Sequence, residues 1–349
     1  MEYKIGMIGC GTVGRGLMEI LLAKGPALKE GLGFEARVVA VTDKLKGSLV
    51  VPEGIDLKKI LAVLEKGLTL DAYPGGKNPQ SGALLPLEMI ETCGADIIAE
   101  MTYTDIKTGE PASGYIEKAL RSGKHVVTSN KGPAALHYHA LKKLAEQNDR
   151  AFRIEGTVMS GTPVFGLFEC GLAGNEVREI RGILNGTTNF ILTKMEEDGM
   201  EYAEALKLAQ KLGYAEADPT ADVEGFDALA KVVILSNVLL GASLKPSDLK
   251  PEGISRIARA DVLQAKKEGF RYKLIGFTRR GPAGVEAGVA PQKIPLSDPL
   301  AGIMGAHNAL TFDTDLMGKV TISGPGAGKT ETGFSILSDM LAIHRRHGR

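Results

Sequence analysis

Apolar and polar positions in the first 150 residues form two alternating kinds of segment. Short, mainly apolar runs predict buried strands, at 3–8, 37–42, 96–100 and 125–128. Longer segments with apolar residues every three or four positions predict helices, at 12–23, 112–121 and 136–147. This alternation is typical of an α/β protein with a doubly wound parallel sheet. A turn-rich stretch at 71–82 interrupts it and is interpreted as an insertion.

The pattern changes after residue 150. Helices are predicted at 202–212 and 227–240, and strands at 176–184, 274–278, 284–289, 311–315 and 319–322. Because these strands do not alternate strictly with helices, we expect a second domain of the α+β class. We expect the first domain to span 1–155 and the second 156–322, while 323–349 form a loop and a helix that return to the first domain.

Composition excludes several kinds of partner. Lysine and arginine together number 42 of the 349 residues, as do aspartate and glutamate, so the chain lacks the basic excess of a nucleic-acid-binding protein. No apolar run approaches the ~18 residues of a membrane span. Cys10, Cys93 and Cys170 form no CxxC, and the first residues lack the layout of a signal peptide. We therefore expect a cytoplasmic protein that binds neither nucleic acid nor a membrane.

The sequence GCGTVG at 9–14 places a GxGxxG between a predicted strand and a predicted helix. In that context the motif indicates a Rossmann-type dinucleotide-binding domain, with NAD or NADP as the cofactor. The first two glycines let the backbone turn and approach the pyrophosphate, the third allows close packing, and the helix N-terminus offers N–H groups to the phosphates. The alternative is a generic glycine turn. The expected cofactor-binding residues are Gly9, Gly11, Thr12, Val13 and Gly14.

An acidic residue, Asp43, ends the second predicted strand, where it can accept a hydrogen bond from the ribose 2′-hydroxyl of NAD. It comes later than the usual spacing of about 20 residues. We expect a glycine-containing loop at 25–33 to account for the extra length. Lys44 and Lys46 follow at once and could neutralise the 2′-phosphate of NADP, so the choice between NAD and NADP stays open.

The stretch SGPGAGKT at 323–330 resembles a phosphate-binding P-loop but is one residue short of the motif. Only 19 residues remain after Thr330, which is enough for a single helix. An NTPase needs further strands to complete its sheet and to place its acidic magnesium ligand, so we exclude that function. The loop can still bind a phosphate at the start of the last helix.

Small polar residues gather in the loop NGTTN at 185–189, between a predicted strand and a helical pattern. Donors of this kind suit a small polar substrate, and Asn185 and Thr187 are the candidate binding residues. The alternative is a loop that merely carries a helix N-cap.

The segment GYAEADPTADVEGFDALAK at 213–231 is rich in acids and leads into a helix that is apolar almost all round. Such a helix is buried, yet Asp227 and Lys231 lie one turn apart on one of its faces. A lysine on a buried helix is rare unless it is paired or functional. With more carboxylates nearby, the pair suits proton transfer. The alternatives are a salt bridge that only fixes the helix and, for the loop, a solvated acidic surface.

Together these motifs resemble the homoserine dehydrogenase family over essentially the whole chain. The matching stretches are, in order, GCGTVG at 9–14, TSNK at 128–131, GILNGTTNFIL at 182–192, LGYAEADP at 212–219, DVEGFDALAK at 222–231 and GPGAG at 324–328. Each stretch is modest alone, whereas the set in this order and spacing is specific. The resemblance implies an NAD(P)-dependent enzyme that interconverts L-homoserine and L-aspartate 4-semialdehyde, in threonine, methionine and isoleucine biosynthesis.

The resemblance also implies roles for matching positions. Lys231 corresponds to the general acid/base that protonates the carbonyl oxygen, and Asp222 to a supporting carboxylate close to the reacting centre. Asp227 and Glu216 correspond to ligands of the substrate's amino group or hydroxyl. Lys131 corresponds to a residue between nicotinamide and substrate that assists proton transfer.

Other positions match parts of the family that hold the cofactor and an ion. Thr102 and Gly328 correspond to cofactor contacts. A loop whose oxygens hold a monovalent cation, Na⁺ or K⁺, in some family members corresponds here to Glu155, Val158, Ser160 and Thr162. The resemblance further implies a homodimer formed through the second domain. Because the chain ends soon after its last helix, we do not expect a threonine-sensing domain.

Two other interpretations of the sequence compete with that of a homoserine dehydrogenase. The first is another Rossmann enzyme that acts on an aldehyde or an amino acid. An aspartate semialdehyde dehydrogenase would need a nucleophilic cysteine paired with a histidine, and Cys93 and Cys170 have no obvious histidine beside them. The second is a catalytically silent dinucleotide sensor, which has no need of a buried proton donor such as Lys231.

Overall fold

The computed structural model describes residues 1–74 and 85–347, and it divides into two compact units. The first unit combines Met1–Gly161 with Gly328–Arg349, and the second is Thr162–Ala327. These boundaries lie a few residues beyond the expected ones, which follow 155 and 322. The insertion expected at 71–82 lies largely outside the described residues.

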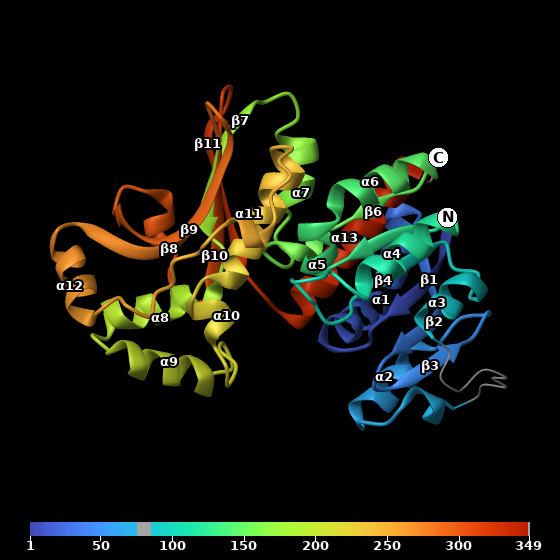
Figure 1. Ribbon diagram of the computed structural model, residues 1–349. Helices are drawn as coiled ribbons and strands as arrows, with labels where there is room; N and C mark the ends of the chain where they lie inside the picture. Colours follow the sequence, from blue (N-terminus) through green and yellow to red (C-terminus); the bar gives the residue numbers. More distant parts are fainter. Residues whose placement is uncertain (75–84, 348–349) are drawn as a thin grey trace. The chain divides into compact units, whose positions relative to one another are not determined.

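The first unit contains the parallel sheet that the alternating pattern predicts, which confirms the α/β prediction (Figure 1). The strand order is β3-β2-β1-β4-β5-β6. The strands are β1 (Glu2–Ile8), β2 (Glu35–Asp43), β3 (Gly47–Val50), β4 (Ile97–Glu100), β5 (His125–Thr128) and β6 (Phe152–Arg153). All neighbours are parallel except the edge strand β3, which pairs antiparallel with β2. The central stretches of β1, β2, β4 and β5 are buried because helices cover both faces of such a sheet.

Helices connect these strands and complete the first unit. They are α1 (Thr12–Leu32), α2 (Leu57–Glu65), η1 (Leu70–Ala72), α3 (Pro86–Thr92), α4 (Ala112–Arg121), α5 (Lys131–Leu136), α6 (Tyr138–Gln147), η2 (Glu155–Thr157) and α13 (Lys329–His347). The strand order reverses between β1 and β4. In a doubly wound sheet, ligands bind at the carboxyl ends of the strands at this reversal point.

The prediction of a loop at 25–33 is wrong, because α1 continues through these residues to Leu32. Pro26 lies inside this helix, and Gly33 ends it with a left-handed φ of 65°. The second half of α1 is largely exposed, so the carbonyl that loses its partner at the proline can be hydrated. A long helix, and not a loop, therefore explains why Asp43 comes late in the sequence.

Two glycines bring the last helix of the chain against the first one. A Cβ added at Gly16 in α1 would lie 2.1 Å from the carbonyl oxygen of Lys329, and a Cβ at Gly333 in α13 would lie 2.7 Å from the backbone of Gly16. Behind this contact, Leu17 and Ile336 are buried in one apolar core. Residues far apart in the sequence thus build the first unit through direct backbone contact between α1 and α13.

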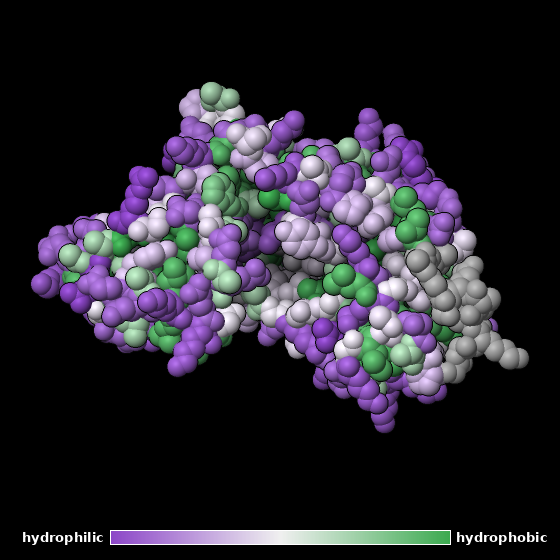
Figure 2. Space-filling model, turned by 60° about the horizontal axis from the view of Figure 1, so that its bottom comes forward, coloured by the Kyte–Doolittle hydropathy of each residue, from purple (hydrophilic) through white to green (hydrophobic). Residues whose placement is uncertain are grey.

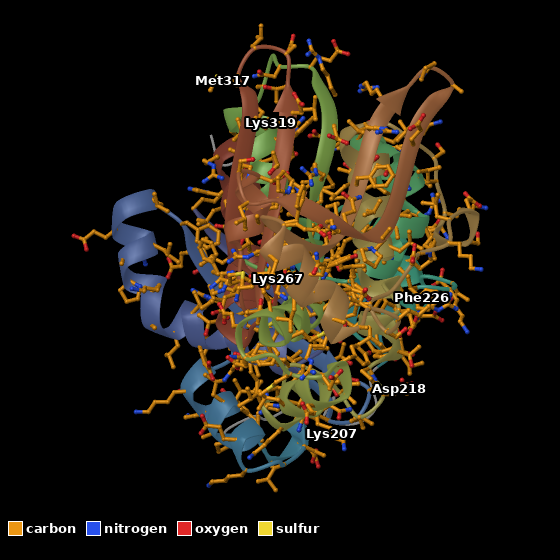
Figure 3. All side chains as sticks on the ribbon, turned by 90° about the vertical axis from the view of Figure 1, so that its left-hand side faces the viewer. Lys207, Asp218, Phe226, Lys267, Met317 and Lys319 are labelled. Atoms are coloured by element: carbon orange, nitrogen blue, oxygen red, sulfur yellow. The ribbon has the colours of Figure 1, made fainter. Side chains whose placement is uncertain are left out.

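The second unit contains an antiparallel sheet with the order β11-β10-β7-β8-β9, which confirms the expected α+β class. Its strands are β7 (Val177–Ile183), β8 (Phe270–Gly281), β9 (Gly284–Pro295), β10 (His307–Thr314) and β11 (Gly318–Pro325). Its helices are α7 (Val164–Gly166), η3 (Leu167–Gly171), α8 (Gly186–Glu197), α9 (Tyr202–Lys211), α10 (Thr220–Val223), α11 (Phe226–Leu239), η4 (Pro246–Asp248), α12 (Arg259–Lys267) and η5 (Pro299–Gly302). Met317 lies in the turn between β10 and β11, and Lys319 lies near the start of β11 (Figure 3).

The surface is mostly hydrophilic, with apolar residues scattered over the face drawn in Figure 2. Among the described residues, no helix combines the length and the hydropathy needed to span a membrane.

The glycine contact between α1 and α13 predicts a selective loss of stability. Gly16→Ala should lower the free energy of unfolding by about 1–3 kcal/mol, because its methyl group has no room. Gly25→Ala, in the same helix, meets nothing within 4 Å. This control should be neutral or stabilising by about 0.5–1 kcal/mol. Urea unfolding of both variants measures the difference, and equal effects would contradict the close approach of the two helices.

Candidate active site

The turn between β1 and α1 has the shape that a pyrophosphate requires. Gly9 has a φ of 96°, and an added Cβ would lie 2.5 Å from the carbonyl oxygen of Met101. A Cβ on Gly14 would lie 2.6 Å from the carbonyl oxygen of Gly9, so only glycine lets the helix pack this closely on the turn. Gly11 faces open space, where a ligand can approach the backbone.

The N-terminus of α1 carries no side-chain cap. Gly11 occupies the N-cap position, and the N–H of Arg15 donates to its carbonyl oxygen at 3.0 Å. The helical residues before Arg15, which begin with Thr12 and Val13, therefore have no intrahelical acceptor for their N–H groups. These groups and the helix dipole together form an anion site of the kind that binds dinucleotides.

Asp43 ends β2 beside this turn and is fixed by three backbone N–H groups. Its Oδ2 accepts from Cys10 at 3.0 Å, and its Oδ1 accepts from Leu45 at 2.9 Å and Lys46 at 3.2 Å. Although burial opposes ionisation, these hydrogen bonds hold the pKa of Asp43 below its ordinary value. A fixed negative charge therefore lies next to the proposed pyrophosphate turn.

A fully buried carboxylate, Glu100, ends β4 at the same edge of the sheet. Its Oε1 accepts from the N–H of Thr102 at 2.8 Å and from the hydroxyl of the same residue, and its Oε2 accepts from the hydroxyl of Thr128 at 2.7 Å. Burial is the largest influence on its pKa and raises it. Asn130 donates to the carbonyl oxygen of Tyr103 at 3.2 Å and so joins the same network.

Lys131 follows this network as the first residue of α5, where it is half-buried. The side chain of Asn130 caps the helix by accepting the N–H of Gly132 at 3.1 Å. A Cβ on Gly132 would lie 2.5 Å from the carbonyl oxygen of Asp105, so the glycine after the lysine permits a close loop contact. The structure therefore places Thr102 and Lys131, both candidate cofactor residues, after neighbouring strands of the first unit.

Gly328 precedes α13 and has a φ of 152°. Its carbonyl oxygen accepts the N–H of Thr332 at 3.0 Å, which starts the helix. The glycine loop before α13 thus leads into a helix of the first unit, and phosphate binding by this loop stays a prediction.

The candidate cation loop has unusual backbone geometry. Met159 and Ser160 adopt left-handed φ values of 59° and 54°, which residues with side chains rarely do. The hydroxyl of Ser160 is bonded to that of Thr332 at 2.7 Å, and the N–H of Glu155 donates to Asp339 at 2.8 Å.

The other candidate cation residues lie along the same segment. Val158 follows η2, and Thr162 is the first residue of the second unit. No cluster of three or more His, Cys, Asp or Glu side chains suited to a metal ion occurs in the described part of the chain.

In the second unit, α11 buries the ammonium group of Lys231 among fixed acceptors. Lys231 is 7% exposed and donates to Asp227 Oδ2 at 2.7 Å, one helical turn earlier. It also donates to the carbonyl oxygen of Leu184, just after β7, at 2.7 Å. Since an ammonium has three N–H groups, one more remains for a substrate oxygen.

Asn185 joins a second carboxylate to this pair. Its amide nitrogen donates to Asp222 Oδ1 at 2.6 Å and to Asp227 Oδ2 at 3.0 Å. The hydroxyl of Thr187 lies 3.2 Å from Asp222 Oδ2 and donates more closely to the carbonyl oxygen of Tyr214, at 2.6 Å. The structure therefore brings together Asn185, Thr187, Asp222, Asp227 and Lys231.

Within this cluster two carboxylates, Asp222 and Asp227, lie close to the ammonium group of Lys231. Burial and the charge of Asp227 raise the pKa of Asp222, while hydrogen bonds from Asn185 and the charge of Lys231 oppose this rise. A buried pair of carboxylates suits a ligand that brings its own cation, such as an amino group.

Glu216 is not part of this cluster. It lies in the loop between α9 and α10, its side chain is exposed, and its backbone oxygen accepts from Gln210 at 3.1 Å. Figure 3 labels two other residues near this loop, Asp218 and Phe226, and both are exposed in the second unit. The role of Glu216 as a substrate ligand stays a prediction.

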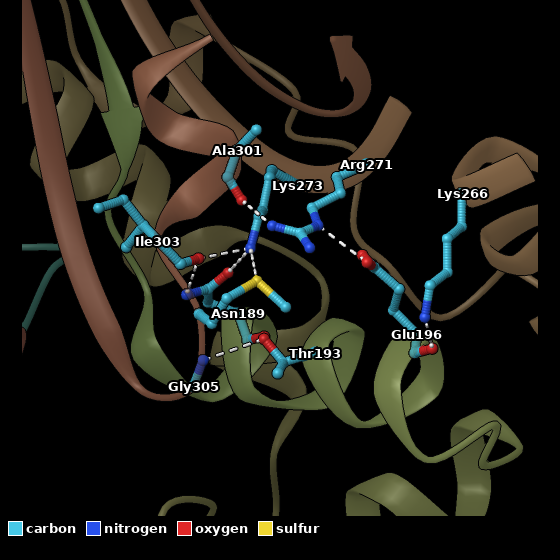
Figure 4. Close-up of polar contacts among 10 residues, drawn as sticks. Asn189, Thr193, Glu196, Lys266, Arg271, Lys273, Ala301, Ile303 and Gly305 are labelled. Carbon is cyan, nitrogen blue, oxygen red and sulfur yellow. Dashed lines mark hydrogen bonds and ion pairs between the residues drawn. The ribbon is translucent and has the colours of Figure 1, made fainter. Parts of the chain in front are cut away.

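A second buried lysine, Lys273, supports the loop at 185–189. Lys273 in β8 is 1% exposed and donates to Asn189 Oδ1 at 2.8 Å and to the carbonyl oxygen of Ile303 at 2.5 Å (Figure 4). Burial lowers its pKa to about 8. Asn189 lies one turn after Asn185 in α8 and donates to the carbonyl oxygens of Ile303 and His307, both at 3.1 Å.

These bonds hold the 303–307 loop against the start of α8. A Cβ on Gly186 would lie 2.6 Å from the carbonyl oxygen of Ala306, so the loop rests directly on the residue after Asn185. The position of Asn185, and through it that of Asp222, therefore depends on a polar network that extends away from the candidate site.

A dinucleotide-binding unit and a buried lysine among carboxylates together define an NAD(P)-dependent oxidoreductase. Residues 9–155 match the family model for the NAD-binding domain of homoserine dehydrogenase, and residues 163–341 match the family model for homoserine dehydrogenase. The chain therefore belongs to the homoserine dehydrogenase family.

Individual relatives agree with this assignment. The chain is 46% identical over 345 residues to an NAD⁺-dependent homoserine dehydrogenase from Pseudomonas canavaninivorans, with 99% of this chain and 97% of the relative covered. A provisionally assigned homoserine dehydrogenase from Archaeoglobus fulgidus matches with a TM-score of 0.86 and 36% identity, over 98% of this chain and 99% of that one. A hyperthermophilic archaeal homoserine dehydrogenase in complex with NADPH has a TM-score of 0.82 and 29% identity, over 99% of this chain and 98% of that one.

Sequence reasoning missed two features of these sites. Glu100 ends the otherwise apolar strand β4. An acidic residue at the carboxyl end of a predicted parallel strand could therefore have been proposed as a site residue from the sequence. The carbonyl oxygen of Leu184 left no signal, because any residue supplies a carbonyl and only the fold directs it toward Lys231.

The raised pKa of Asp222 predicts a dependence of stability on pH. The folded protein keeps a proton on Asp222 at pH values where the unfolded chain has lost it, so ionisation of this group costs stability as the pH rises above the ordinary value of 3.8. Each unit of raised pKa corresponds to about 1.4 kcal/mol. Asp222→Asn should therefore be more stable than the wild type, by a margin that grows from pH 4 towards neutrality. Thermal unfolding across this range tests it, and a constant difference would contradict the assignment.

Proposed function

We propose that this protein interconverts L-homoserine and L-aspartate 4-semialdehyde with NAD(P) as the coenzyme. The observation that carries the proposal is the buried Lys231 ammonium, which keeps one N–H beyond those bound to Asp227 and Leu184. A proton donor fixed in this way is what the carbonyl oxygen of an aldehyde needs as it becomes an alkoxide. Membership of the homoserine dehydrogenase family supports the choice of substrate.

Lys231 carries the proton in both directions of the reaction. As an ammonium it donates a proton to the oxygen of the developing alcohol during reduction, and as a neutral amine it accepts that proton during oxidation. Asp227 stabilises the charged form at 2.7 Å, and Asp222 adds a second carboxylate close by. NAD(P)H, when bound, supplies the hydride from the nicotinamide ring.

The remaining residues of the second unit orient the substrate. The excess negative charge of Asp222 and Asp227 attracts the α-ammonium that both proposed substrates carry. Asn185 and Thr187 hold Asp222 through hydrogen bonds, so they fix the carboxylate as well as offering polar groups of their own. Glu216 adds a carboxylate in the loop between α9 and α10.

The residues of the first unit fit a dinucleotide. Gly9 and Gly11 let the pyrophosphate approach the backbone, and the uncapped start of α1 compensates its charge. Thr102, Lys131 and Gly328 complete the proposed cofactor contacts. We assign to Lys131 a supporting part in proton transfer, which rests on the family resemblance alone.

We propose that NAD is preferred to NADP. Asp43 already accepts three backbone N–H groups and keeps its negative charge. A carboxylate at the end of β2 accepts the ribose 2′-hydroxyl of NAD and repels the 2′-phosphate of NADP. The NAD⁺-dependent relative at 46% identity supports this preference.

The cation and the homodimer complete the proposal. A monovalent cation, Na⁺ or K⁺, would be held by the loop that contains Glu155, Val158, Ser160 and Thr162, and the left-handed backbone at Ser160 supports it. The homodimer would form through the second unit, where β9 is an edge strand with half-exposed apolar residues. The reaction would serve threonine, methionine and isoleucine biosynthesis.

Removal of the proton donor should abolish most of the activity. Lys231→Met keeps an unbranched side chain but no proton, and kcat should fall by about 10²–10⁴-fold. The assay follows the absorbance of reduced nicotinamide with L-homoserine and NAD⁺ or NADP⁺. Lys207→Met, on the exposed face of α9, is the matched control and should keep wild-type turnover. Equal rates for both variants would rule out Lys231 as the donor.

The coenzyme preference should change when the charge at the end of β2 is removed. Asp43→Asn should raise kcat/KM for NADP⁺ relative to NAD⁺ by about tenfold, because repulsion of the 2′-phosphate is lost. Asp56→Asn, an exposed N-cap of α2 in the same unit, should leave the ratio unchanged. An unaltered ratio in Asp43→Asn would show that Asp43 does not choose the coenzyme.

A further inference from the structure

Glu100 is a buried carboxylate with no cationic partner. Its side chain is 0% exposed, and every group that donates to it is neutral: the N–H and hydroxyl of Thr102, the hydroxyl of Thr128 and the amide of Asn130. No lysine, arginine or histidine among the described residues forms a salt bridge with it. A buried carboxylate without a counter-charge is costly, so its presence at this edge of the sheet calls for an explanation.

The place of Glu100 in the sheet supplies one. It is the last residue of β4 and pairs with Ile8, the last residue of β1, and with Thr128, the last residue of β5. The strand order reverses between β1 and β4, where a dinucleotide crosses the sheet. The glycine turn and Asp43 take the adenosine half on the side of β1 and β2. The nicotinamide half then falls on the side of β4 and β5.

The nicotinamide ring changes its charge in the reaction. In NAD⁺ the ring carries a positive charge, whereas in NADH it is neutral. A carboxylate near this ring therefore attracts the oxidised coenzyme and has little effect on the reduced one. The hydrogen-bond donors around Glu100 all point at carboxylate oxygens, and they oppose the rise in the pKa of Glu100 that burial causes.

We propose that Glu100 is the residue by which this protein discriminates between the oxidised and reduced forms of its coenzyme, through the charge it places at the nicotinamide half of the site. The proposal rests on the binding of NAD(P) by the first unit. It assigns to Glu100 a function beyond holding Thr102 and Thr128 in place. A purely structural role would affect both coenzyme forms alike.

Calorimetric titration of the whole protein with NAD⁺ and with NADH tests the proposal without measuring turnover. Glu100→Gln keeps the shape of the side chain and removes its charge. NAD⁺ should bind about tenfold more weakly to this variant, as expected for one lost charge interaction at a high effective dielectric constant, and NADH should change by less than about twofold. Glu117→Gln, an exposed carboxylate on α4, controls for the loss of a charge elsewhere in the unit and should change neither affinity.

Thr128→Val provides a second variant if Glu100→Gln does not fold. It removes one donor to the carboxylate and leaves the glutamate in place. Its affinity for NAD⁺ should fall more than its affinity for NADH, by a smaller factor than in Glu100→Gln.

Each outcome is decisive. Equal weakening of both coenzyme forms in the Glu100 variant, or no change in either, would overturn the proposed discrimination and leave the oxidoreductase function intact. Failure of the wild type to bind NAD⁺, NADH, NADP⁺ and NADPH would instead overturn the proposed function itself.

Discussion

The second unit is organised around an ammonium group inside an apolar helix. Moving a charge out of water is costly unless partners replace the lost hydration. Lys231 obtains these partners from Asp227 in its own helix and from the Leu184 carbonyl at the end of β7. Strand β7 must therefore end close enough to α11 for Lys231 to reach the carbonyl oxygen of Leu184. Asn185, the next residue, then brings Asp222 into the cluster, so the need to solvate one lysine assembles the whole site.

Burying these charged groups costs free energy, and hydrogen bonds behind the site keep the groups in place. Two carboxylates share one ammonium, and burial together with Asp227 raises the pKa of Asp222. Such a cluster would rearrange if its backbone could move. Lys273 and Asn189 prevent this, because they fix the 303–307 loop against Gly186 at the start of α8. The backbone at the start of α8 is therefore held by a network around Lys273, whose printed hydrogen bonds are separate from those of Lys231.

Sequence patterns predicted those parts of the protein whose physics is local. The GxGxxG turn and the apolar strand runs can be found because backbone geometry and burial act over a few residues. Likewise, Lys231 and Asp227 lie one turn apart in one helix. The pairing of Asn185 with Asp222 lies beyond local patterns, since it joins residues 37 apart in sequence. The predicted end of α1 was wrong. Gly25 and Pro26 usually end a helix, whereas here α1 continues through them and packs against α13.

The two units follow one electrostatic rule with different residues. In each, a buried carboxylate lies near the end of a strand or helix: Glu100 as the last residue of β4, and Asp222 beside α11. Burial raises the pKa of both groups, because it makes their charged forms costly. A ligand that brings a positive charge removes that cost. The oxidised nicotinamide ring and the α-ammonium of both proposed substrates carry such a charge. Under the proposed function, each unit would therefore use a buried carboxylate to attract a cationic ligand group.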